Sequence, residues 1–109
     1  VEWASTQLNL ANALQYLPSV HQEQNLDEAV HLYEEVLQYR DPHRDPVGYA
    51  RILANQGNAL GHLGVFSDAR ERLTQAREMF VAAGDADSVE GVDEVLASLT
   101  EAESAVGGR

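Results

Sequence analysis

Two clusters of titratable side chains have the residue types that catalysis or metal binding would need. His43 lies between Asp41 and Asp45 in the stretch DPHRD, where a carboxylate beside an imidazole could support acid–base chemistry. His31 and Glu34 share one side of a predicted helix, but two ligands need further helices to complete a metal site. Loops flanked by prolines commonly use aspartate for turns and caps, and the pair in the helix is most simply an exposed one. We therefore expect no catalytic residue, no metal and no cofactor.

Asparagine recurs at matching positions in the middle of two predicted helices. Asn9 and Asn12 are followed 46 residues later by Asn55 and Asn58. Asparagine is unfavourable inside a helix because its amide competes for backbone hydrogen bonds. An amide can donate and accept together, so these residues could clamp the backbone of an extended peptide. The alternative is that they have a packing role or are solvated.

The asparagines belong to a longer internal repeat. Residues 1–14, VEWASTQLNLANAL, return as residues 47–60, VGYARILANQGNAL. A repeat of this period is typical of stacked helical architectures, which mostly act by offering an extended surface to a partner. The pattern predicts an interaction protein and leaves the partner open.

Composition excludes several classes of protein. The 109 residues contain 18 acidic and seven basic side chains, for a formal net charge of −11, and no cysteine. Disulfides are therefore excluded, and nucleic acid and anionic membranes are poor partners for so acidic a chain. No apolar run approaches the roughly 20 residues that cross a bilayer. We expect a cytoplasmic protein whose acidic surface either attracts a basic partner or serves only solubility.

Turn and cap signals divide the chain into five predicted helices. The first ends at Pro18, and the second begins with Asn25 as its cap and frays near Arg40. The remaining signals mark the third, fourth and fifth helices and the tail. They are Asp45 as a cap before Pro46, Gly64 as a stop, Ser67 as a cap, Gly84 as a stop, a last helix over about 88–105, and a disordered end VGGR.

Apolar residues at helical spacing predict which side of each helix is buried. In the first helix this side carries Trp3, Gln7, Leu10, Leu14 and Leu17. The corresponding residues of the other helices are Leu26, Ala29, Val30, Tyr33, Val36 and Leu37; Leu53, Gly57, Leu60 and Leu63; Phe66, Ala69, Leu73, Ala76, Phe80 and Ala83; and Val89, Val92, Leu96, Leu99 and Ala102. The last helix is acidic on its other side, which suits the free end of a stack.

The stretch NQGNALGHLGVFSDARERLTQA resembles one tetratricopeptide repeat, with small residues where two helices cross and larger ones around them. An earlier unit matches less closely because its turn, PSVHQEQ, is longer. The resemblance covers the chain from Trp3 to about Ala83. It implies an all-α fold with two helix-turn-helix repeats, at about 2–40 and 46–83, and a capping helix at about 88–105. The five helices would form one domain shaped as a short right-handed superhelix.

The resemblance also implies a concave groove, lined by the first helix of each pair, that binds a peptide or helix. Its principal residues would be Asn9, Asn12, Tyr16, Arg51, Asn55, Asn58 and His62, with Ser5, Leu8, Gln15, Ala54 and Gly61 beside them. This predicts an adaptor module of a larger protein. The alternative is self-association, as a homo-oligomer or by exchange of helices, because the edge of the first helix has no preceding repeat to cover it. Gln56 departs from the repeat pattern and, if buried, needs a polar contact.

Overall fold

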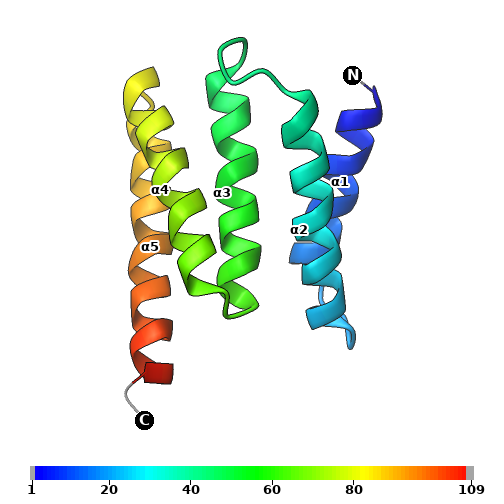
Figure 1. Cartoon of the computed structure of the whole chain (residues 1–109), viewed down its shortest axis with the longest axis vertical. Coiled ribbons are helices and arrows are strands. Elements are labelled where there is room, and N and C mark those ends of the chain that lie inside the picture. Colours follow the sequence, from blue (N-terminus) through cyan, green and yellow to red (C-terminus); the bar gives the residue numbers. More distant parts are fainter. Residues whose placement is uncertain (1, 108–109) are drawn as a thin grey trace.

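Five α-helices follow one another in the computed structural model, which describes residues 2–107, and that range contains no strand. The helices are α1 (Glu2–Tyr16), α2 (Gln22–Tyr39), α3 (Pro46–His62), α4 (Phe66–Ala83) and α5 (Ala86–Gly107). They lie side by side in a slab of 44 × 32 × 20 Å, with α3 in the middle, α1 and α2 on one side of it, and α4 and α5 on the other (Figure 1). Each helix contacts the next along the chain, and α3 also touches α5. The all-α prediction is confirmed.

Three of the predicted helix boundaries are confirmed, each with the expected chemistry. Asp45 caps α3 by accepting a hydrogen bond from the Gly48 backbone N–H at 3.0 Å, and Pro46 occupies the first turn, where it needs no N–H partner. Gly64 and Gly84 end α3 and α4 with φ angles of 80° and 74°. Only glycine adopts this left-handed conformation without steric cost, so both turns depend on it.

The start of α2 differs from the prediction. The helix begins at Gln22, three residues before the expected cap Asn25, and the cap position is His21. The side chain of Gln22 donates to the backbone carbonyl of Gln15 at 3.0 Å and so satisfies one of the free carbonyls at the end of α1. This contact closes the turn early, which the capping-box pattern did not indicate.

Two further boundaries also lie earlier or later than predicted. Ser67 is inside α4, whose cap position is Val65, because the tight turn at Gly64 brings the chain directly into the helix. Helix α5 extends from 86 to 107 rather than from 88 to 105, and Asp85 holds its start by accepting from the backbone N–H of Ser88 at 3.3 Å. Residues 106 and 107, expected to be disordered, are helical, while 108–109 lie outside the described residues.

The core is centred between α2, α3 and α4, with residues of α1 and α5 packed on it, and most of the predicted residues of α2, α3 and α4 are buried or half-buried, although Ala83 is exposed. The largest fully buried side chains include Tyr33 from α2, Leu53 from α3 and Leu73 from α4. Helices α3 and α4 approach closely at Gly57, where an added Cβ would lie only 2.7 Å from Leu73 Cγ. Helix α5 is held against α4 by two ion pairs, Arg70–Glu103 and Arg77–Asp93, each 2.6 Å long.

The predicted buried side of α1 is wrong for three of its five residues, while Leu14 packs against the core. Trp3, Leu10 and Leu17 are 46%, 44% and 62% exposed. The buried side carries Ala4 and Ala11, because small side chains let α1 approach the helices beside it. Both sides of this helix have apolar residues at helical spacing, so periodicity alone could not choose between them.

No helix within residues 2–107 combines the length and the apolar character that a membrane span requires.

Candidate functional site

A network of side-chain amides and hydroxyls joins the first three helices. The hydroxyl of Tyr33 in α2 donates to Asn12 Oδ1 in α1 at 2.5 Å and accepts from Gln15 Nε2 at 3.0 Å. Gln15 in turn accepts from Asn58 Nδ2 in α3 at 2.9 Å, and its Nε2 also lies 3.1 Å from the backbone carbonyl of Asn55. Gln15 is 5% exposed, so α1 and α3 are connected by a buried, hydrogen-bonded amide.

Two tyrosines of this network remain neutral donors at ordinary pH. Burial raises the pKa of Tyr33 well above its usual value, more than the hydrogen bond from Gln15 lowers it. Desolvation also raises the pKa of Tyr16. The Tyr16 hydroxyl donates to Asn55 Oδ1 at 2.9 Å, at the point where α1 meets the open face of α3.

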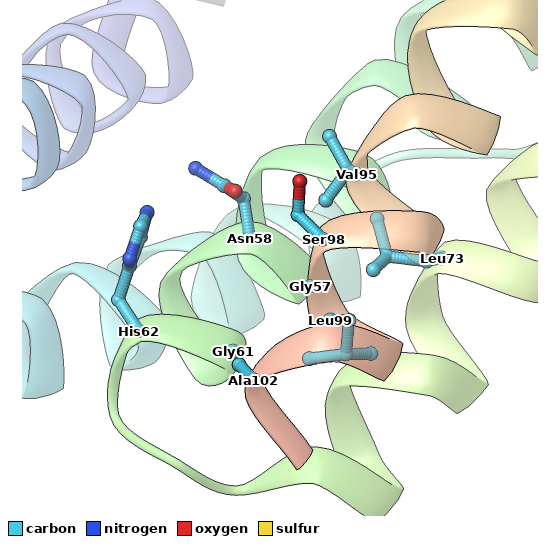
Figure 2. Close-up of a pocket in the computed structure, with 9 residues that line it drawn as sticks. All are labelled: Gly57, Asn58, Gly61, His62, Leu73, Val95, Ser98, Leu99 and Ala102. Carbon is cyan, nitrogen blue, oxygen red and sulfur yellow. The ribbon is translucent and has the colours of Figure 1, made fainter. Parts of the chain in front are cut away.

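Beside the network lies a series of three adjoining hollows. The first lies between α3 and α5 and has a volume of about 110 Å³; Asn58, His62, Val95 and Ser98 are among the residues that line it (Figure 2). The second and third have volumes of about 250 and 400 Å³. We call the three together the groove. Its lining residues are Gln15, Tyr16, Pro18, Gln22, Leu26, Ala54, Asn55, Gly57, Asn58, Gly61, His62, Leu73, Phe80, Ser88, Gly91, Val92, Val95, Ser98, Leu99 and Ala102.

Among the residues that the structure describes, the lining of the groove contains no aspartate, glutamate, lysine or arginine. The whole chain has a net charge of −11 and is 23% charged residues, so this neutrality is a local property. Amides, hydroxyls and His62 supply the polar atoms, and leucine, valine and glycine supply the rest. The arrangement can bind by hydrogen bonds and apolar contact, and it offers no formal charge for an ion pair.

The structure brings four of the seven principal predicted residues to the groove: Tyr16, Asn55, Asn58 and His62. Asn12 lies next to it and accepts from Tyr33 within the network. Asn9 and Arg51 are exposed and do not line any of the three hollows. Arg51 lies near Asp85, where its charge adds to the hydrogen bonds from Ser88 that lower the pKa of that carboxyl group.

Helix α5 supplies one side of the groove, which the sequence reasoning missed. Its contribution is a row of residues, Gly91, Val95, Ser98 and Ala102, at spacings of four, three and four. This spacing places them on one side of a helix and was visible in the sequence. We predicted that α5 only covers the end of the stack, and that interpretation hid its second surface.

Gln56 has a buried polar contact, as its departure from the repeat pattern required. It is 2% exposed and donates to the backbone carbonyl of Val30 at 3.2 Å and to Glu34 Oε1 at 3.0 Å. Glu34 also pairs with Arg72 at 3.2 Å, so the three side chains connect α2, α3 and α4. None of the three lines the groove, and Gln56 Oε1 is buried without a hydrogen-bond partner among residues 2–107, so the cluster connects the helices with one acceptor unsatisfied.

The titratable clusters named first in the sequence have local structural partners. Asp41 Oδ1 accepts from the His43 backbone N–H at 2.9 Å, and Asp45 caps α3, so both carboxylates shape the loop. His31 Nδ1 lies 2.8 Å from the backbone carbonyl of Asp27, on the exposed side of α2. Within residues 2–107, no group of three or more histidine or carboxylate side chains is arranged to hold a metal ion.

Comparison with known proteins adds no relative: no family model matches the chain, and neither a curated protein nor a solved structure is significantly similar to it.

Proposed function

We propose that this chain is an adaptor module of the tetratricopeptide type, which binds a segment of another protein in the groove formed by α1, α3 and α5. The observation that carries the proposal is the uncharged groove beside prearranged amides, Asn55 and Asn58, whose partners Tyr16 and Gln15 hold them in place. Because these side chains are already held in place, less conformational entropy is lost when a ligand binds. The proposed activity is binding without catalysis, in the cytoplasm, with no cofactor.

The neutrality of the groove selects the chemistry of the bound segment. A charged side chain buried there would lose its hydration and find no opposite charge, which is costly. The preferred segment is therefore uncharged over the length it buries, with small or aliphatic side chains for the open space at Gly91. Polar backbone or amide groups of the ligand would pair with Asn58, Ser98 and His62 at the rim.

The acidic surface around the groove favours a ligand with basic flanks. Helix α5 alone carries six carboxylates: Asp87, Glu90, Asp93, Glu94, Glu101 and Glu103. Only Asp93 and Glu103 are paired with arginines of α4, and the other four are exposed. Their field would raise the association rate of a basic partner without contributing contacts inside the groove, so salt should slow binding more than it speeds dissociation.

A selection from a displayed library of random peptides about 15 residues long, about 22 Å when helical, tests the proposal. The blocking variant is Gly91→Leu. Gly91 lines the groove and a Cβ there meets no atom within 4 Å, so the added side chain fills the groove and favours the helix. Ala97→Leu is the matched control, because Ala97 is exposed on α5 outside the groove.

We expect selected peptides with an uncharged centre, at least tenfold weaker binding to Gly91→Leu, and unchanged binding to Ala97→Leu, all measured by fluorescence anisotropy. An enrichment that both variants retain would show that the peptides bind elsewhere. Failure to enrich any sequence, or enrichment of peptides with a charged centre, would contradict the proposed ligand.

A further inference from the structure

An apolar row on the outer side of α1, continued by Leu17 directly after the helix, is left about half-exposed by the rest of residues 2–107. Trp3, Leu10 and Leu17 follow one another at intervals of seven residues, about two helical turns, and each is between 44% and 62% exposed. Tyr39 from α2 is 77% exposed and meets the ring of Trp3 edge to face, with the ring centres 5.1 Å apart. We call these four residues the α1 face.

The α1 face lies in a stretch without formal charge. From Trp3 to Gln22 the chain contains no aspartate, glutamate, lysine or arginine, although its net charge is −11. By contrast, α2 contains five carboxylates and α5 contains six. The stretch 3–22 is therefore a surface that a second, equally acidic molecule can approach without bringing rows of carboxylates together.

We propose that the α1 face is a homodimer interface, in which α1 helices of two copies pair antiparallel about a two-fold axis next to Leu10. The spacing of the row makes it complementary to itself, as a two-fold interface requires. With Leu10 on the axis, Leu10 meets its own counterpart, and Trp3 lies opposite Leu17 of the partner subunit. The seven-residue interval keeps the row on one side of the helix, as in the seam of a coiled coil.

The charge pattern favours a second copy over a basic partner. A basic protein would gain most at α2 or α5, where carboxylates are exposed, and would find no opposite charge on the α1 face. Charged residues flank the face in the sequence: Glu2 precedes Trp3, Arg40 follows Tyr39, and the exposed Glu35 precedes Tyr39 by four residues. In a dimer such carboxylates lie at the rim as like charges, so salt should strengthen the association.

The size of the face sets the expected affinity. A helix of 15 residues is about 22 Å long, and a pair of such helices buries less than the roughly 800 Å² per partner of a standard interface. We therefore expect a reversible dimer with a dissociation constant on the order of 10–100 micromolar. The one tryptophan of the chain, Trp3, lies in the interface and reports on it through its fluorescence.

A charge-exchange experiment tests this geometry. Leu10→Glu and Leu10→Arg each place like charges at the axis and should be monomeric in sedimentation velocity at about 100 micromolar, where the unmodified chain dimerises. An equimolar mixture of the two should recover the dimer and shift the Trp3 emission to shorter wavelength. Val81→Glu changes an exposed apolar residue on α4 and is the control, with dimerisation unchanged.

Each result decides the proposal, and circular dichroism confirms that the variants are folded. Recovery in the mixture supports pairing at Leu10, and a dimer that tightens between about 50 and 500 millimolar salt supports an interface between like-charged molecules. A monomeric unmodified chain at about 300 micromolar overturns the proposal. A dimer that survives Leu10→Glu, or a mixture that stays monomeric, overturns the two-fold pairing.

Discussion

The two helix pairs, α1–α2 and α3–α4, have different kinds of side chain at equivalent positions of their contact. At equivalent positions of their first helices, α1 has Ala11 and α3 has Gly57; at equivalent positions of their second helices, α2 has Tyr33 and α4 has Leu73. In the α3–α4 pair the leucine presses against the glycine with no polar contact. In the α1–α2 pair a tyrosine packs near the alanine side of α1 and donates its hydroxyl to Asn12.

The difference indicates that one pair mainly contributes stability and that the other mainly orients polar side chains. Apolar contact is strong but nondirectional, so the α3–α4 pair gains stability from closeness. A buried hydrogen-bonded network contributes less net free energy but fixes the orientation of its members. The network of the first pair reaches α3 through Gln15 and sets the amides at the groove, while the second pair provides the rigid support beneath them.

The largest expected effect comes from removing the leucine of the second pair. Leu73→Ala deletes a side chain that is 1% exposed and leaves a cavity against Gly57. We expect the free energy of unfolding to fall by about 3–4 kcal/mol, measured by urea denaturation. Val81→Ala removes apolar atoms from an exposed site on the same helix and should change stability by less than about 0.5 kcal/mol. Equal effects would show that α3 and α4 are not closely packed.

Two glycine substitutions should have opposite signs. Gly57→Ala brings a Cβ to 2.7 Å from Leu73 Cγ, and we expect it to destabilise the protein by about 1–2 kcal/mol despite the better helix propensity of alanine. Gly91→Ala has the same gain in propensity and meets no atom within 4 Å, so it should stabilise by about 0.5–1 kcal/mol. Thermal unfolding of both variants makes the comparison. Stabilisation by Gly57→Ala would contradict the close crossing.

Removing the Tyr33 hydroxyl alone should destabilise the protein through the polar network. Tyr33→Phe keeps the ring and removes the hydroxyl, leaving Asn12 and Gln15 without that partner, so we expect a loss of about 1–2 kcal/mol. A double-mutant cycle with Asn12→Ala should give a combined loss smaller than the sum of the two, because both changes break the same bond. Additive losses, each measured by chemical denaturation, would show that the two residues do not interact.

The dependence of the unfolding free energy on alkaline pH should report on Tyr33, which belongs to the first helix pair. The folded state raises the pKa of Tyr33, so above about pH 10 the unfolded chain releases the proton while the folded chain keeps it. Stability is therefore full below that pH and falls as pH rises, by about 1.4 kcal/mol per unit. The chain has no lysine, which simplifies the titration. We expect Tyr33→Phe to flatten the decline in denaturation series from pH 8 to 11.

Much of the helical framework was predictable because its signals are local. Asp45 before Pro46, and the glycines at 64 and 84, act through the backbone of their own turns and were identified correctly. The start of α2 was missed because Gln22 bonds to the end of another helix, a contact that no local pattern encodes. The exposed position of Trp3 was missed for the same kind of reason, since burial depends on which side meets a neighbour.

The candidate groove was predictable in part. The repeat of asparagines led to Asn55 and Asn58, and the offset of 46 residues led to the helices that carry them. The contribution of α5 was missed, although Gly91, Val95 and Ser98 lie at helical spacing, because their function as a wall depends on α5 packing against α4.

The sequence by itself determined that this chain is all-α, where several of its helices end, and that two of them carry the same amides. These properties follow from backbone conformation, periodicity and local capping, which act over a few residues. Only the tertiary structure decided that Gln15 and Tyr33 are members of one network, that the groove is free of charge, and that the row of Trp3 faces outward. These depend on which distant surfaces meet, because burial and hydrogen-bond partners are set by the packing of whole helices.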